Sequence, residues 1–257
     1  MGTWLTFDVG EAIAERERRA RVLDAFFDAG GGMIDSSPMY GRAERVVGDL
    51  VAQRARSSEL IAATKVWTPF ESRGAQQVEQ SLRLWRLPRL DIVYVHNLLN
   101  WRAHLPTLRS FKDRGLVRWI GVTTSHGARH AEMLDVIRRE PLDFMQITYS
   151  VADTSAEPVI AAALDRGIAV MANRPFDGGA LVDRANRLPL PGWAREIGCE
   201  NWAQVLLKWI VSHPGVVCAI PATSDPAHMA QNMGAARGAL PDAALRRHIA
   251  EHLQRWL

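Results

Sequence analysis

Short runs of apolar, mostly β-branched residues recur along the chain, and segments with helical periodicity separate them. The predicted strands cover residues 2–5, 33–35, 60–65, 92–96, 117–123, 144–148, 168–172 and 216–220. All but the first are continuous hydrophobic runs, which is typical of strands that are covered on both faces. The pattern therefore predicts a buried parallel sheet.

Between these runs, apolar residues recur at the spacing of one helix face. Such a stripe runs through Val22, Phe26 and Ala29, and a second one runs from Trp202 to Ile210. Residues 174–200 are rich in Gly and Pro and predict a long loop with a helical piece. Strict alternation of strand and helix, with right-handed crossovers, predicts a closed α/β fold, the (β/α)₈ TIM barrel.

The length of 257 residues suits one closed barrel, so we expect a single domain over residues 1–257. The chain is 47% hydrophobic and 23% charged, as is usual for a soluble globular protein. An open, doubly wound sheet is the alternative. That fold usually carries a nucleotide-binding loop, and the sequence contains no GxGxxG or Walker motif.

Several classes of protein are disfavoured by composition. The net charge is +3, but the basic residues are spread along the chain, which argues against nucleic-acid binding. Cys199 and Cys218 are far apart and belong to no metal-ligand motif, so we expect no disulfide framework and no metal site. The chain has neither a long apolar segment nor a start typical of a signal peptide, so we expect a cytoplasmic protein that does not enter a membrane.

Polar and ionisable residues stand at the carboxyl ends of the predicted strands, where α/β barrels place their active sites. Asp35, Lys65 and His96 end three successive strands, and Tyr40 lies on the loop after Asp35. A phenol has an ordinary pKa of about 10, and a nearby ammonium lowers it. We therefore expect Lys65, held by Asp35, to lower the pKa of Tyr40 and make it a proton donor. His96 would either orient a carbonyl oxygen by a hydrogen bond or relay the proton.

At these positions the sequence resembles the aldo-keto reductase superfamily over essentially the whole chain. The resemblance rests on the following segments: Gly2-Thr3-Trp4, Ile34-Asp35-Ser36-Ser37, Tyr40-Gly41, Ala63-Thr64-Lys65-Val66, Val95-His96-Asn97, Arg118-Trp119-Ile120-Gly121-Val122, Gln146 with Tyr149, Ala219-Ile220-Pro221 and Gln231-Asn232. It implies that Asp35, Tyr40, Lys65 and His96 are a catalytic tetrad. It also implies NADPH or NADH across the barrel mouth, delivering hydride to an aldehyde or ketone that Tyr40 then protonates.

The resemblance further implies a set of cofactor-binding residues: Gly2, Thr3, Asp35, Thr123, Thr124, Gln146, Asn173, Arg174, Pro221, Ala222, Thr223, His228, Gln231 and Asn232. Three positions depart from the family pattern. Thr123-Thr124 replaces a Ser-Asn pair, Asn173 replaces an aromatic residue that stacks on nicotinamide, and Ala222 with His228 replaces a Lys and an Arg that hold the 2′-phosphate. The preference between NADPH and NADH is therefore open.

Both ends of the chain are short for this family. The usual N-terminal β-hairpin is absent, and the specificity-setting tail is missing after a helix predicted from about Pro241 to Leu257. We expect Trp4, Trp67 and Trp101 to line a substrate pocket for a small carbonyl compound. We also expect the uncovered barrel floor to be an interface between copies of this chain, or to be covered by a segment upstream of Met1.

Two other functions remain open on the sequence alone. The first is a cofactor-binding regulatory or sensor barrel with little turnover, as some members of the family are. The second is a lyase that uses Lys65 as a Schiff base, although the intact tetrad argues against it.

Overall fold

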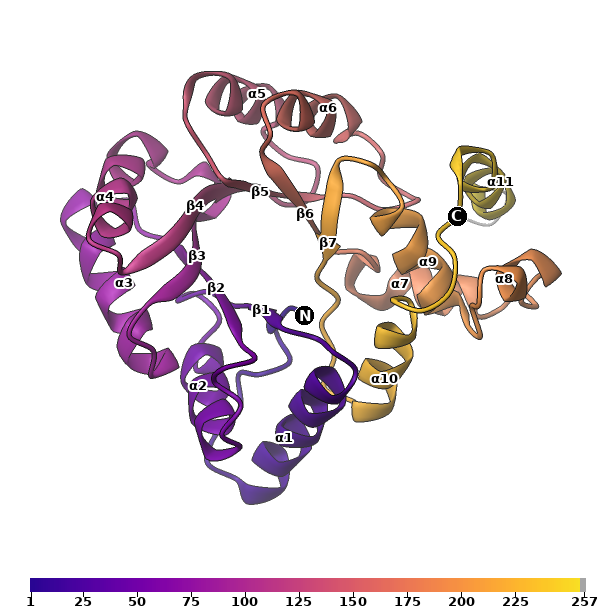
Figure 1. The fold of residues 1–257 in the computed structure, drawn as a ribbon, viewed down its shortest axis with the longest axis horizontal. Coiled ribbons are helices and arrows are strands. Elements are labelled where there is room, and N and C mark those ends of the chain that lie inside the picture. The colour runs from indigo at the N-terminus through magenta and orange to yellow at the C-terminus, as the bar shows by residue number, and fades with distance from the viewer. Residues whose placement is uncertain (255–257) are drawn as a thin grey trace.

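The computed structural model of the protein describes residues 1–254. Seven strands form one parallel sheet, and their order in the sheet follows the chain from β1 to β7. The curled sheet forms an incomplete ring, with β1 and β7 at its two edges and the helices outside it (Figure 1). The strands are β1 (Met33–Asp35), β2 (Ile61–Val66), β3 (Leu90–Val95), β4 (Val117–Thr123), β5 (Phe144–Thr148), β6 (Ala169–Asn173) and β7 (Val216–Ala219).

Helices connect successive strands, and each one returns the chain to the same end of the sheet, which keeps the strands parallel. The predicted long loop between β6 and β7 contains short helical pieces, as expected. The helices are α1 (Ile13–Asp28), α2 (Ala43–Gln53), α3 (Glu71–Trp85), α4 (Trp101–Asp113), α5 (His130–Arg139), α6 (Glu157–Asp165), α7 (Ala180–Ala185), α8 (Gly192–Glu196), α9 (Trp202–Val211), α10 (Pro226–Gly234) and α11 (Ala243–Gln254), with 3₁₀ turns η1 (His96–Leu98) and η2 (Asp177–Gly179).

The first predicted strand, over residues 2–5, is wrong. Only Gly2 takes part in the sheet, through single parallel bridges to Asp35 on one side and Ala222 on the other. The chain turns immediately afterwards, because the amides of Thr6 and Phe7 donate to the Thr3 carbonyl. One residue therefore joins the two edges of the seven-stranded sheet.

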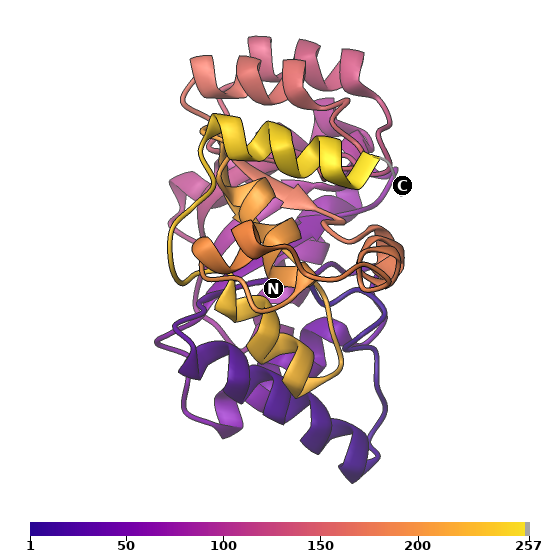
Figure 2. The same cartoon turned by 90° about the vertical axis from the view of Figure 1, so that its right-hand side faces the viewer.

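The C-terminal helices gather on one flank of the molecule (Figure 2). The last of them, α11, is attached through Arg246, whose Nη2 donates to the Tyr149 hydroxyl at 2.9 Å and whose guanidinium lies 4.3 Å from the centre of the Trp209 ring. The final helix predicted from the sequence is thus present up to Gln254, and its last residues lie outside the described part of the chain. No helix within residues 1–254 is long and apolar enough to cross a membrane.

The core has two parts. The larger lies between the sheet and the helices, and the smaller fills the inside of the ring with Ala63, Ile92, Tyr94, Met171 and Ile220. The Tyr94 ring needs a glycine beside it, because a Cβ on Gly121 would lie 2.8 Å from the ring and 2.3 Å from the Phe144 carbonyl oxygen. These side chains fill the space inside the sheet beneath the carboxyl ends of the strands.

A cavity of about 340 Å³, which we call the second cavity, lies near the amino ends of β1 and β7. Its walls are mostly apolar and include Met1, Met33, Val217, Cys218 and Met229. The Met1 ammonium is buried beside it and donates to the Met33 carbonyl at 2.5 Å. Residues of α1, α9 and α10, among them Phe26, Leu207 and Met233, also line it, so this cavity lies between the sheet edges and these helices.

Candidate active site

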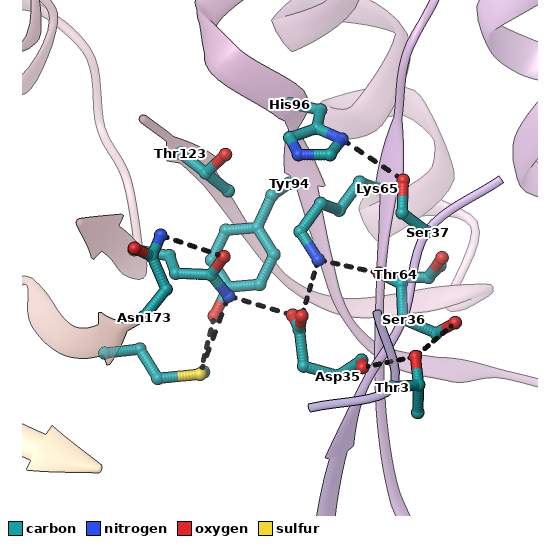
Figure 3. A network of polar contacts seen from close by, with 12 residues as sticks. Thr3, Asp35, Ser36, Ser37, Thr64, Lys65, Tyr94, His96, Thr123 and Asn173 are labelled. Atoms are coloured by element: carbon teal, nitrogen blue, oxygen red, sulfur yellow. Dashed lines mark hydrogen bonds and ion pairs between the residues drawn. The ribbon is translucent and has the colours of Figure 1, made fainter. Parts of the chain in front are cut away.

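Four polar side chains point into the ring from the carboxyl ends of separate strands. Asp35 ends β1, Lys65 lies near the end of β2, His96 follows β3 and Gln146 lies on β5. Parallel pairing aligns these ends at one face, since β1 pairs with β2 and β2 with β3. The sheet therefore brings together residues that are far apart in the sequence (Figure 3).

The centre of the site is a buried ion pair. Lys65 Nζ lies 2.6 Å from Asp35 Oδ2 and donates a second hydrogen bond to the Ser36 carbonyl at 2.7 Å. Burial by itself lowers the pKa of Lys65, but the Asp35 carboxylate and the Tyr40 hydroxyl outweigh it and the net pKa is raised. Lys65 therefore stays protonated at every pH near neutrality.

The other carboxylate oxygen of Asp35 is held by Gln146, whose Nε2 donates to Asp35 Oδ1 at 2.8 Å. Asn173 Nδ2 in turn donates to Gln146 Oε1 at 3.5 Å. Asn173 also donates to the Thr124 carbonyl at 2.9 Å and accepts from the Thr148 hydroxyl at 2.7 Å. The amides of Gln146 and Asn173 thus connect β5 and β6 to the ion pair.

Tyr40 lies directly above this pair. A turn after β1, closed by Tyr40 N donating to the Ser37 carbonyl at 2.9 Å, places its ring 5.0 Å from Lys65 Nζ. Burial raises the pKa of Tyr40, and the Lys65 ammonium only partly opposes this effect. Lys65 therefore lowers the pKa of Tyr40, as expected, but burial raises it by more, so the net pKa lies above its ordinary value. The sequence does not reveal this burial.

His96 completes the cluster, with its ring centre 5.9 Å from that of Tyr40 in an edge-to-face arrangement. Its Nδ1 lies 3.1 Å from the Ser37 hydroxyl. Burial, together with the nearby Lys65 charge, lowers the pKa of His96 to about 2. The imidazole is therefore neutral and acts through hydrogen bonds rather than through charge.

A cavity of about 370 Å³ opens above the cluster. Tyr40 and His96 line it, whereas Lys65 lies beneath its surface and is buried. Most residues expected to hold a cofactor on the strand ends also line it, namely Gly2, Thr3, Asp35, Thr123, Gln146, Asn173, Arg174, Pro221 and Ala222.

The remaining predicted cofactor residues, Thr124, Thr223, His228, Gln231 and Asn232, are not among the residues that line this cavity. Thr124 is buried behind it, and its hydroxyl has no hydrogen-bond partner among the described residues. Asn232 lines the second cavity, near the amino end of β1. Thr223 and His228 lie at the start of α10, where the Thr223 hydroxyl accepts from Asp225 N at 3.1 Å.

Only one of the three predicted pocket tryptophans lines the cavity. Trp4 does so and is 43% exposed. Trp67 is exposed but lies outside the lining, and Trp101 is buried with its indole N–H donating to Glu132 at 3.0 Å. Trp101 begins helix α4, so its ring packs against the neighbouring helix instead of facing the mouth, and its assignment to the pocket is wrong.

Other cavity residues were missed by the sequence analysis. Met39, Asn97, His126 and Phe176 line the cavity from loops that follow β1, β3, β4 and β6. The signal that could have found them is their position within a few residues of a strand end. Ser37, which contacts His96, belongs to the same class of loop residue.

The residues present fit a nicotinamide dinucleotide. The cavity floor offers uncharged hydrogen-bonding groups, which suit a carboxamide, and Arg174 adds a cation at the rim. Beyond the rim, α10 begins with Pro226 and is capped by Asp225, which accepts from Ala227 N at 2.8 Å. Such a helix N-terminus favours anionic groups, and Arg18 lies 3.2 Å from the Asp225 carboxylate.

Comparisons with known proteins identify the family. The model of the aldo/keto reductase family matches residues 1–249. The chain is 25% identical to methylglyoxal reductase YeaE of Escherichia coli over 95% of this chain and 87% of that protein. It is also 25% identical to pyridoxine 4-dehydrogenase of the same organism, over 90% of this chain and 85% of that protein.

Solved structures share the fold. An aldo/keto reductase from Klebsiella pneumoniae in complex with NADP and acetate superposes with a TM-score of 0.82 at 23% identity, over 100% of this chain and 90% of that chain. The aldo-keto reductase AKR11C1 from Bacillus halodurans, in its holo form, gives a TM-score of 0.80 at 19% identity, over 98% and 90%. The chain therefore belongs to the aldo/keto reductase family, a family of NAD(P)H-dependent oxidoreductases.

Proposed function

We propose that the protein reduces an aldehyde or ketone to an alcohol with NADPH or NADH, and that Tyr40 supplies the proton. The observation that carries this proposal is the position of the Tyr40 ring, which lines a cavity and lies 5.0 Å from the ammonium of a buried ion pair. The names of the two relatives from Escherichia coli, a reductase and a dehydrogenase, support a carbonyl–alcohol interconversion.

Each residue of the cluster has a separate task in this reaction. A bound nicotinamide cofactor supplies the hydride for the carbonyl carbon. Tyr40 donates its phenolic proton to the carbonyl oxygen as negative charge develops there. Lys65 stabilises the phenolate that remains, and Asp35 holds Lys65 in place; His96, being neutral, can only hydrogen-bond to the oxygen.

The shape of the sheet supports the same proposal. If Gly2 is counted as a strand of one residue, the sheet closes as the eight-stranded barrel predicted from the sequence. The cavity then lies at the carboxyl end of the barrel, where barrel enzymes bind their substrates. The amides of Gln146 and Asn173, which already hydrogen-bond within the protein, are the groups we propose to face the nicotinamide.

Replacement of Tyr40 by Phe tests the proton donor. Tyr40→Phe should lower kcat by about 10²–10⁴-fold, the usual contribution of general acid catalysis, and leave the Kd for the cofactor nearly unchanged. Oxidation of NADPH with a panel of small aldehydes and a fluorescence titration measure the two quantities. Tyr149→Phe is the matched control, because that hydroxyl binds Glu157 and Arg246 outside the cavity. Near wild-type kcat in the Tyr40→Phe variant would exclude Tyr40 as the donor.

The pH profile tests the protonation states. Since burial raises the pKa of Tyr40 and lowers that of His96 to about 2, neither group changes charge near neutrality. We expect kcat/KM for reduction to be flat from about pH 6 to 9, without the limb near pH 6.5 that an ordinary histidine gives. Lys65→Met removes the charge that opposes burial, so the pKa of Tyr40 rises further and the rate falls. A limb near pH 6.5 that disappears in His96→Gln would contradict this account.

Cofactor preference tests the two departures near α10. With Ala222 and His228 at positions where the family often has Lys and Arg, discrimination for NADPH over NADH should be weak, because fewer fixed cations would face the 2′-phosphate. Ala222→Lys with His228→Arg should favour NADPH, since a charge-assisted contact contributes about 1.5–3 kcal/mol. The ratio of kcat/KM for the two cofactors measures this. Strong NADPH preference in the wild type would mean that other groups hold the phosphate.

A further inference from the structure

The Ser37 hydroxyl has a single hydrogen-bond acceptor among the described residues. Its Oγ lies 3.1 Å from His96 Nδ1, and the only other contact is with the Met39 amide, which donates to Oγ at 3.4 Å. Ser37 is fully buried. If Nδ1 carried a proton, the Ser37 proton would have no acceptor, and an unsatisfied buried donor destabilises the fold.

The same contact determines which nitrogen of the His96 ring carries the proton. When Ser37 donates to Nδ1, the ring proton must be on Nε2, because a neutral imidazole carries only one. No hydrogen bond from residues 1–254 reaches Nε2, and His96 lines the cavity. In Figure 3, Nε2 lies on the side of the ring away from Ser37. Nε2–H is thus free to donate to a bound molecule.

We propose that Ser37 is a positioning residue that holds His96 in the Nε2–H tautomer and aims this N–H at the carbonyl oxygen of the substrate. In this arrangement the Met39 amide donates to the Ser37 hydroxyl, and the Ser37 hydroxyl donates to His96 Nδ1. The remaining N–H of the ring, Nε2–H, is then available to the cavity. The substrate part of this inference rests on the proposed carbonyl reduction; the tautomer does not. Neutral His96, whose pKa is about 2, matches this use.

Nitrogen NMR of the ¹⁵N-histidine-labelled protein, without substrate, tests the tautomer directly. The His96 signals are assigned by their loss in His96→Gln. We expect a proton on Nε2 and a hydrogen-bonded, unprotonated Nδ1 at pH 7. A proton on Nδ1 would overturn the proposal, whether or not the protein reduces any aldehyde.

Substitution of Ser37 then separates positioning from packing. Ser37→Ala should move the His96 nitrogen shifts and lower kcat by about 10-fold, the lower end of the effect seen when the hydrogen-bond partner of a metal-bound imidazole is removed, with the cofactor Kd unchanged. Ser37→Thr keeps the hydroxyl and should restore both the shifts and most of kcat. Ser36→Ala, in the same loop, removes an equally buried hydroxyl that contacts Thr3 instead, and should leave the His96 shifts unchanged.

Two outcomes of these substitutions overturn the proposal. One is a Ser37→Ala variant with wild-type His96 shifts and wild-type kcat. The other is an equal change of the shifts in the Ser36 and Ser37 variants, which would indicate a general effect on the loop. If the wild type turns over no carbonyl substrate while Nε2 carries the proton, the proposed function fails and the role of Ser37 in setting the tautomer stands.

Discussion

The ion pair between Lys65 and Asp35 is the constraint around which the rest of the site is built. Two opposite charges in a buried place are stable only when they are close and their remaining hydrogen-bonding groups are satisfied. Here Lys65 donates a second hydrogen bond to the Ser36 carbonyl, and Gln146 donates a hydrogen bond to the second carboxylate oxygen of Asp35. The pair therefore fixes the relative positions of β1, β2 and β5 at the end of the sheet where the cavity opens.

The single-residue link between the two edges of the sheet lies in the same region. Gly2 bridges Asp35 and Ala222, and the Asp35 amide donates to the Met1 carbonyl at 2.8 Å. The Thr3 hydroxyl lies 2.9 Å from the Asp35 carbonyl. The short N-terminal segment thus contacts the backbone of the residue whose side chain holds Lys65. The bridge between the two sheet edges and the placement of the Lys65 ammonium therefore depend on the same residue, Asp35.

The sequence predicted most of this fold because buried parallel strands are apolar runs and their carboxyl ends carry polar residues. It failed at residues 2–5, where pattern alone did not reveal the turn after Gly2 that ends the pairing. It placed Trp101 in the pocket because position along the chain does not give the direction of a side chain. The pKa of Tyr40 and the contact of Ser37 with His96 depend on burial and on distances across the ring, which no local pattern contains.

The most direct test of the central ion pair is a double-mutant cycle on stability, measured by denaturant unfolding without cofactor. Asp35→Asn or Lys65→Met alone leaves one buried charge unpaired, which costs about 3–5 kcal/mol in comparable cases. We expect the double variant to lose several kcal/mol less than the sum of the two single losses, because no unpaired charge remains. Losses that simply add would contradict this account, since they would mean that the two charges do not stabilise each other.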